Sequence, residues 1–224
     1  MNVITRRDLI VGTVKTTSAL GILGPISRAL GATPSQTEGP FHPVNQDNDL
    51  TRKSPNSPPA IGEIIYLYGE VRDEQGRGLS NAVVELWQAA ANGKYNHPGD
   101  PNPKPVDPNF QYWGRDITDA SGKFAFKTIR PGEYPADATW TRPAHIHFRI
   151  LRPGFEDLTT QMYFSPENDH EQELLEKDRI LNALSPADRK KLIIEFRLAP
   201  TASHLEANAK VGFFPIEMRQ NRQT

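Results

Sequence analysis

The first sign of chemistry is a pair of histidines separated by one residue. They lie in the run Arg142-Pro143-Ala144-His145-Ile146-His147-Phe148. Side chains alternate between the two faces of a β-strand, so His145 and His147 would share a face and could bind one metal ion. A single His-x-His pair is weak evidence, because such a pair is often only a polar strip on a strand. The residues available to complete the site therefore decide the interpretation.

The chain offers few other ligands for such a metal. It contains no cysteine, which excludes disulfides, thiolate metal sites, iron–sulfur clusters and cysteine nucleophiles. No acidic residue lies between Asp137 and Glu156, whereas a ferrous site built from two histidines and a carboxylate usually takes a nearby acid. The remaining titratable oxygen donor is tyrosine, which occurs six times.

A tyrosine ligand would indicate a hard, highly charged cation. A phenol has a pKa of about 10, so it ionises at neutral pH only beside a strong positive charge. Fe(III) supplies such a charge more readily than zinc or ferrous iron. Tyr95 and Tyr134 lie in turn-rich loops that follow predicted strands, whereas Tyr66 and Tyr68 lie in an apolar strand that favours packing. Spacing alone permits Tyr95 and Tyr134 as ligands and does not select them.

The elements that would position these side chains are mainly strands. The chain holds 20 prolines and 16 glycines, which favours a turn-rich β protein over a helical bundle. Alternating apolar residues predict strands over 63–73, 82–87, 144–151, 158–164 and 192–198, with a hairpin over 116–129. One short helix is predicted over 171–184, and a long irregular segment over 92–114. The predicted fold class is all-β, an antiparallel β-sandwich with long decorating loops and one short helix.

The N-terminal residues have a different character. Within residues 1–32, Arg6 and Arg7 precede a weakly apolar stretch that ends in small residues, and this resembles a twin-arginine export signal. Lys15 and several glycines make the stretch a poor membrane anchor. A disordered or amphipathic arm is the alternative. We therefore predict an export signal over 1–32, an extended arm over 33–60 and a catalytic β-sandwich over 61–224, in a protein exported to the periplasm or beyond.

The overall charge excludes one class of partner. The chain carries 26 basic and 27 acidic residues, a formal net charge of −1, with no basic block. A nucleic-acid-binding role is therefore not expected.

Four stretches, in order along the chain, resemble the intradiol ring-cleavage dioxygenases. They are residues 69–89 with Val84-Glu85-Leu86-Trp87, the run Lys127-Thr128-Ile129-Arg130-Pro131-Gly132-Glu133-Tyr134-Pro135, the histidine run described above, and Thr160-Gln161-Met162-Tyr163-Phe164. We expect a closer resemblance to the protocatechuate 3,4-dioxygenases than to the catechol 1,2-dioxygenases, because no long helical N-terminal domain is predicted.

The resemblance implies a function and a metal centre. It implies Fe(III) held by Tyr95, Tyr134, His145 and His147, and a reaction of a small catecholic substrate with O2. The ring would open between its two hydroxyl-bearing carbons to give a muconate-type diacid. Tyr134 would act both as a ligand and as a base, and Arg142 would stabilise negative charge that develops on the ring.

The resemblance also implies a substrate pocket. Gln161 and Tyr163 match pocket residues on one strand. Thr37, Gly39 and Pro40 match an arm that belongs to the non-iron subunit of protocatechuate 3,4-dioxygenase. Since this chain carries both the arm and the ligands, we expect one gene product to supply both, within a monomer or across a homo-oligomer.

Two positions depart from the family pattern. Ala136 stands where the family usually has a tryptophan, and Phe41 stands where relatives can have tyrosine. Both changes favour a reshaped pocket and leave the identity of the catechol open.

Two other functions fit part of the pattern. A non-catalytic, transthyretin-like β-sandwich binding module would explain the strands but would give Arg142 and Gln161 no role. A metallohydrolase would use His145, His147 and a distant acid.

Overall fold

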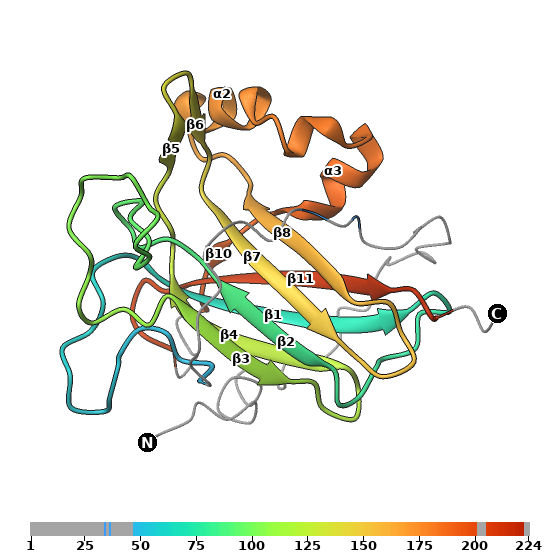
Figure 1. The fold of residues 1–224 in the computed structure, drawn as a ribbon. Coiled ribbons are helices and arrows are strands. Elements are labelled where there is room, and N and C mark those ends of the chain that lie inside the picture. Colours follow the sequence, from blue (N-terminus) through green and yellow to red (C-terminus); the bar gives the residue numbers. More distant parts are fainter. Residues whose placement is uncertain (1–33, 35, 37–46, 201–204, 222–224) are drawn as a thin grey trace.

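The computed structural model describes Pro34, Gln36 and residues 47–200 and 205–221 of the chain. These residues form a sandwich of two sheets whose strands cross, with the helices gathered beyond one end (Figure 1). The four-stranded sheet has the order β10 (Arg197–Leu198), β11 (Lys210–Met218), β1 (Ile64–Asp73) and β4 (Lys123–Ile129). The five-stranded sheet has the order β3 (Trp113–Ile117), β2 (Val83–Trp87), β7 (His145–Leu151), β8 (Leu158–Phe164) and β9 (Ile193–Ile194).

The core fills the space between these sheets. Phe148 of β7 is fully buried, and its ring centroid lies 5.1 Å from that of Phe214 in β11 and 6.3 Å from that of Phe124 in β4. On each strand the residues that alternate with the core residues point away from the opposite sheet. The five-stranded sheet thus has an outer face that remains available for a functional site.

The predicted β-sandwich is confirmed, but its pairing is mixed rather than wholly antiparallel. β1 pairs with β11 in parallel, and β8 pairs with β9 in parallel. Strand β11 was not predicted, since it contains Pro215, which cannot donate a ladder hydrogen bond. The predicted hairpin over 116–129 is wrong in its pairing, because β3 belongs to one sheet and β4 to the other. The turn between β3 and β4 therefore carries the chain from one sheet to the other.

The single helix predicted over 171–184 is divided. Helix α2 (Asp169–Lys177) ends where Asp178 adopts an extended conformation, and a short 3₁₀ helix η2 (Leu181–Ala183) follows. A second helix, α3 (Pro186–Leu192), begins after Ser185, whose hydroxyl accepts from the backbone of Asp188. A small two-stranded sheet of β5 (Tyr134–Asp137) and β6 (Trp140–Arg142) projects beside α2 (Figure 1).

The described part of the predicted arm lies against the sandwich. The backbone N–H of Leu50 donates to Lys127 O at 2.8 Å, and Leu50 is fully buried. Further toward the N-terminus, Gln36 N–H donates to Thr159 O at 2.6 Å. The predicted export signal over 1–32 lies outside the described residues. Within the described residues, no helix has both the length and the apolar character needed to cross a membrane.

Adjacent phenylalanines of β11 provide a test of this packing. Phe214 is fully buried, whereas Phe213 is 49% exposed on the outer face. We expect Phe214→Ala to lower the free energy of unfolding by about 3–5 kcal/mol, because it removes buried contacts and leaves a cavity. Phe213→Ala, the matched control, should cost less than about 1 kcal/mol. Urea denaturation measures both, and equal losses would contradict the assignment of the two faces.

Candidate active site

The candidate site lies on the outer face of the five-stranded sheet. Ile146, Phe148 and Ile150 of β7 pack in the core, so His145 and His147 point away from it. Strand register then sets the neighbours of the two histidines. Trp87 of β2 and Gln161 of β8 lie opposite His147 on its two sides, and Tyr163 of β8 lies opposite His145. Three strands therefore contribute adjacent side chains to one surface.

The two histidines present nitrogen atoms to the same point. His145 Nδ1 lies 2.8 Å from Pro143 O; a carbonyl oxygen only accepts, so Nδ1 carries the proton and Nε2 keeps its lone pair. The Nε2 atoms of His145 and His147 lie 3.2 Å apart. Metal–nitrogen bonds of about 2.1 Å commonly place two ligands of one ion about 3 Å apart. Burial, together with Arg142 and His147, lowers the pKa of His145 well below its ordinary value, so the ring is neutral.

Trp87 fixes the second histidine. Its indole lies parallel to the His147 ring, with a centroid distance of 5.0 Å and an interplanar angle of 6°. Trp87 is only 1% exposed. The stacked indole and the strand pairing together restrict the rotation of the imidazole.

Tyr95 comes from the segment between β2 and β3, where residues 88–112 contain no helix or strand, as predicted for most of that range. Polar contacts within the segment hold it in place. Tyr95 N–H donates to Asp100 Oδ2 at 2.7 Å, and Lys94 Nζ donates to the carbonyls of Asp100 and Asn102 at 3.0 and 2.7 Å. The Tyr95 side chain is buried, and its ring centroid lies 6.5 Å from that of His147.

Tyr134 begins β5 and meets the other rings from a different element. Its ring centroid lies 5.4 Å from that of Tyr95 and 5.6 Å from that of His145. Unlike Tyr95, it is only half-buried. The structure thus brings Tyr95, Tyr134, His145 and His147 together from three separate parts of the chain.

Two glycines let the tyrosine-bearing segments approach each other. Gly132 N–H donates to Ala90 O at 3.0 Å. A Cβ atom on Gly132 would lie 2.3 Å from Ala91 O, and one on Gly93 would lie 2.1 Å from Glu133 O. Gly93 also has a φ of +81°, which other residues adopt at a cost. The separation of Tyr95 from Tyr134 therefore depends on backbone-to-backbone contact.

The four side chains fit a hard metal ion by their chemistry. Burial raises the pKa of Tyr95 well above that of a free phenol, and the nearby Tyr134 raises it further. Burial also raises the pKa of Tyr134, although Arg142 partly offsets this effect. Both phenols are therefore protonated unless a cation takes the place of the proton. The two imidazoles beside two such phenols form a donor set suited to a trivalent ion.

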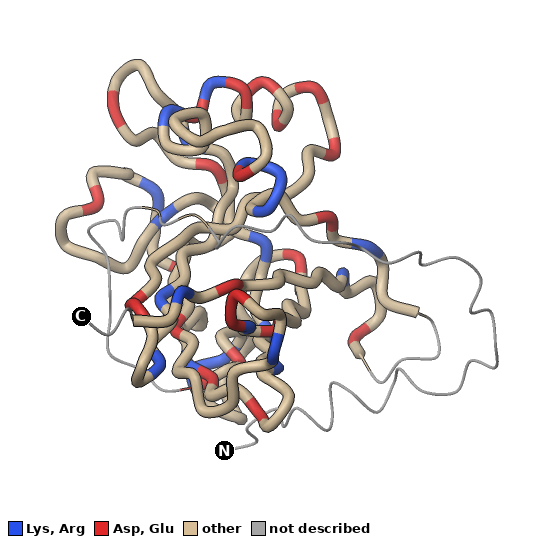
Figure 2. Tube along the Cα trace, turned by 90° about the vertical axis from the view of Figure 1, so that its right-hand side faces the viewer, with Lys and Arg blue, Asp and Glu red and all other residues tan. Residues whose placement is uncertain are grey.

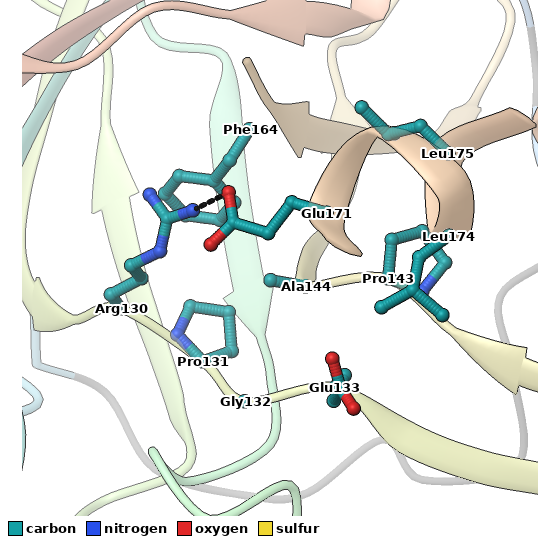
Figure 3. Close-up of a pocket in the computed structure, with 10 residues that line it drawn as sticks. All are labelled: Arg130, Pro131, Gly132, Glu133, Pro143, Ala144, Phe164, Glu171, Leu174 and Leu175. Atoms are coloured by element: carbon teal, nitrogen blue, oxygen red, sulfur yellow. Dashed lines mark hydrogen bonds and ion pairs between the residues drawn. The ribbon is translucent and has the colours of Figure 1, made fainter. Parts of the chain in front are cut away.

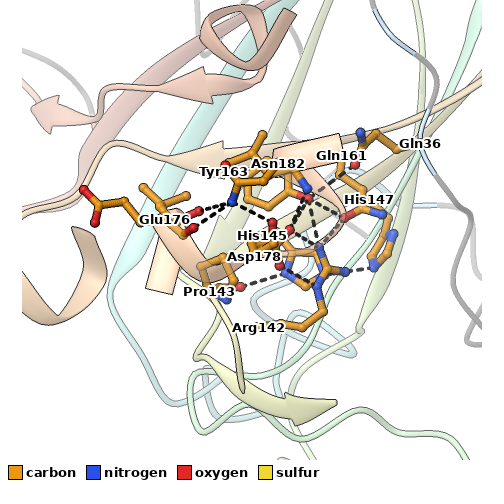
Figure 4. A network of polar contacts seen from close by, with 12 residues as sticks. Gln36, Arg142, Pro143, His145, His147, Gln161, Tyr163, Glu176, Asp178 and Asn182 are labelled. Carbon is orange, nitrogen blue, oxygen red and sulfur yellow. Dashed lines mark hydrogen bonds and ion pairs between the residues drawn. The ribbon is translucent and has the colours of Figure 1, made fainter. Parts of the chain in front are cut away.

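Arg142 connects the histidines to the predicted pocket residues. Its Nη2 donates to Gln161 Oε1 and to Tyr163 Oη, both at 2.9 Å, and its Nη1 lies 3.1 Å from His145 Nε2 (Figure 4). Its Nε donates to Asp178 Oδ2 at 3.0 Å. Burial opposes its charge, but Tyr163 and Asp178 outweigh that effect and raise the pKa of Arg142. The guanidinium is thus permanently charged within the site.

Sequence reasoning missed Asp178 and Gln36. Asp178 is fully buried, and it falls at helical spacing from Leu174, Leu175 and Leu181, on what would be the apolar face of the predicted helix. An acid on an apolar face needs a buried partner, and that signal could have identified it. Gln36 Oε1 accepts from Tyr163 Oη at 3.3 Å, and no spacing rule connects it with β8. Thr37, Gly39 and Pro40, predicted to line the pocket, lie outside the described residues.

The metallohydrolase alternative lacks its acid in the described structure. No group of three or more His, Cys, Asp or Glu residues that could hold a metal ion occurs within 47–200 and 205–221. Asp178 is engaged by Arg142 rather than by the histidines. Basic and acidic residues are both distributed along the described trace (Figure 2).

A separate pocket lies behind the ligand-bearing segments. It is bounded by α2 and by the chain that leads to β5, with Leu174 and Phe164 among its apolar walls (Figure 3). Arg130 and Glu171 line it and form an ion pair at 2.9 Å. None of the four clustered tyrosine and histidine side chains lines it.

The fold and the site together define a β-sandwich protein with a tyrosine–histidine centre, and comparison with known proteins gives its relationships. A family model described as "Dioxygenase" matches residues 37–213. The protocatechuate 3,4-dioxygenase beta chain of Burkholderia cepacia is 42% identical over 159 residues, which cover 69% of this chain and 65% of that relative. Catechol 1,2-dioxygenase of Candida albicans is 30% identical over 169 residues, covering 64% of this chain and 54% of that relative.

A solved structure agrees. The dioxygenase domain of a dioxygenase–carbohydrate-binding fusion protein from Streptomyces sp. SirexAA-E has a TM-score of 0.60 and 25% identity, covering 85% of this chain and 100% of that domain. The chain belongs to the intradiol ring-cleavage dioxygenases, an iron-dependent family. It spans between about half and two thirds of the length of the two curated relatives.

A pair of glycines tests whether the close approach of the two tyrosine segments builds the site. We expect Gly93→Ala to weaken metal binding by about tenfold or more and to lower the Tm, because the new Cβ would meet Glu133 O. Gly154→Ala is the matched control, since Gly154 has a similar φ of +87° but no atom within 4 Å of the added Cβ. Iron titration and thermal unfolding measure the two effects. Equal iron affinity in both variants would show that the approach is not required.

Proposed function

We propose that this chain binds Fe(III) and cleaves a catechol ring with O2 between the two hydroxyl-bearing carbons, giving a muconate-type diacid. The observation that carries the proposal is the convergence of Tyr95, Tyr134, His145 and His147 on one point of the sheet, in a member of this family. When bound, the iron would supply Lewis-acid activation and a template for the catechol oxygens.

The protein residues have separate tasks in this proposal. Tyr95 is deeply buried beside His147, whereas Tyr134 is half-buried and lies next to Arg142. Of the two phenolates, Tyr134 is therefore the better placed to leave the ligand set. Its Oη atom could then accept a proton from a catechol hydroxyl. Tyr95 would keep the site anchored while that proton moves.

Arg142 would stabilise the negative charge of the reacting ring. Its Nη1 edge faces His145, and its charge lowers the cost of an anion at Tyr134. Arg142 is only 3% exposed, so water screens its charge weakly and the effect of that charge on a nearby anion is large. Gln161 and Tyr163 hold its Nη2 edge.

The chemical test is direct. Protein loaded with Fe(III) should be red-brown, with a visible tyrosinate-to-iron charge-transfer band, and should consume O2 in the presence of catechols. A screen of substituted catechols with product identification by mass and absorbance separates intradiol from extradiol cleavage. A protein that stays colourless after loading would contradict the proposal and favour the binding-module alternative.

The assignment of Tyr134 has its own test. Tyr134→Phe should shift the visible band and lower kcat by about 10²- to 10⁴-fold, the usual contribution of a general base. Tyr68→Phe is the control, since Tyr68 lies on the outer face of the opposite sheet, outside the site. Far-ultraviolet circular dichroism should be unchanged in both variants. Unchanged turnover in Tyr134→Phe would exclude Tyr134 from the ligand set.

We also propose that residues 1–32 direct export by the twin-arginine route, as the Arg6-Arg7 pair and the weak apolar stretch suggest. That route carries folded proteins, so iron could be installed before export. One chain, as a monomer or a homo-oligomer, would then supply both the arm and the metal ligands.

The export proposal predicts that substitution of the two arginines changes only where the protein is found in the cell. In a bacterial host, Arg6→Lys with Arg7→Lys should retain the full-length chain in the cytoplasm, whereas Lys15→Arg should be exported like the wild type. Fractionation followed by immunoblotting measures the distribution. Export of the Arg6/Arg7 variant at the wild-type level would contradict the proposal.

A further inference from the structure

Asp178 is the most completely buried charged group that contacts the site. Its side chain has 0% exposure. Its Oδ2 accepts from Arg142 Nε at 3.0 Å (Figure 4). Its Oδ1 accepts from Leu181 N–H at 2.7 Å and lies 3.3 Å from Tyr163 Oη. A buried carboxylate is tolerated only when paired and hydrogen-bonded in this way.

The backbone around Asp178 is fixed without any help from Arg142. Asp178 caps α2, and its N–H donates to Leu175 O at 3.3 Å. Asn182 Nδ2 donates to the carbonyls of Leu175, Glu176 and Asp178 at 3.0, 3.0 and 2.7 Å. These bonds satisfy carbonyls that the end of a helix leaves without partners. Asp178 is therefore a stationary anchor.

Asp178 binds the edge of the Arg142 guanidinium that carries Nε. Asp178 binds Nε and approaches Nη2 at 3.4 Å, whereas Nη1 is directed to His145. A guanidinium is planar, so holding the Nε edge sets the direction of the remaining N–H groups. The ring of Trp140 lies 5.4 Å from Arg142 Cζ and covers one face.

We propose that Asp178 is a positioning residue for Arg142, and that through it the segment after α2 sets the direction in which Arg142 presents Nη1 to the reacting ring. The proposal rests on the function proposed above for Arg142. The side-chain contacts of Asp178 are to Arg142, Tyr163 and Leu181, so it would act through Arg142 and not on the substrate directly. It acts by removing the freedom of the guanidinium to turn when charge develops on the ring.

Asp178→Asn is the informative substitution. The amide oxygen can still accept from Leu181 N–H, so the local cap is kept, but an amide NH₂ group cannot accept from Arg142 Nε. Glu173→Gln is the matched control, since it makes the same chemical change on the exposed side of α2.

The first measurement does not depend on activity. In the metal-free protein, the ¹H–¹⁵N resonance of Arg142 Nε–H, identified by its loss in Arg142→Met, should exchange slowly with water. We expect exchange at least tenfold faster in Asp178→Asn and unchanged in Glu173→Gln. Rapid exchange of Arg142 Nε–H in the wild type would overturn the proposal, even if the protein proved not to be a dioxygenase.

The second measurement uses iron-loaded protein with catechol itself as the probe. Asp178→Asn should keep the iron content and the visible band of the wild type, while kcat falls about 10- to 100-fold and KM changes less than about threefold. A kcat within twofold of the wild type would overturn the proposal. A wild-type protein with slow Nε–H exchange but no band and no O2 uptake would instead refute the proposed function and leave the positioning contact standing.

A double variant separates positioning from a merely structural role. Arg142→Met with Asp178→Asn leaves no unpaired charge in the interior, so it should fold even if Asp178→Asn alone is unstable. If Asp178 acts through Arg142, the double variant should turn over catechol at the rate of Arg142→Met alone. A further loss that multiplies the two single effects would overturn the proposal.

Discussion

One face of strand β7 packs in the core and the other carries the two histidines, and this combination constrains the rest of the molecule. Ile146, Phe148 and Ile150 must enter the core to join the two sheets, and the same pleat then directs His145 and His147 outward. A shift of one residue in the pairing of β7 would exchange the two sets. Burial of the apolar residues therefore sets the direction of the two histidine side chains. Stability and site geometry are set by the same register.

The outer face of a sheet is open to water, so the site must be enclosed by other parts of the chain. The segment with Tyr95 and the chain that leads to Tyr134 come together through Gly93 and Gly132, where no side chain intervenes. On the opposite side, the end of α2 brings Asp178 against Arg142. The enclosure removes water from the charged groups, which strengthens their interactions. It also explains why both phenols need a cation in order to ionise.

Much of this could be predicted from the sequence, for physical reasons that differ by element. Strands with alternating apolar residues, such as β1 and β7, were placed to within a residue or so, because burial on one face leaves a local pattern. The end of the predicted helix at Asp178 and the strand β11 were not predicted. The conformation at Asp178 and the pairing of a strand that contains Pro215 both depend on contacts with residues far away in the sequence. The strand period alone predicted that His145 and His147 share a face, but their role as metal ligands came from the family resemblance. Tyr95 and Tyr134 required the family resemblance, since loop tyrosines lack any period, and Gln36 left no local signal.

The parallel pairing of β1 with β11 has a consequence for biosynthesis. The first strand of the described sandwich receives this neighbour only when the last described strand has been made, so the four-stranded sheet cannot close before residues 210–218 are available. The segment that carries Asp178 lies between these strands in the chain and is also late to emerge. A chain truncated before Lys210 would leave β1 with an unpaired edge, which is prone to aggregation. Closure of the four-stranded sheet is therefore a late step of folding, because it needs the pairing of greatest sequence separation in that sheet.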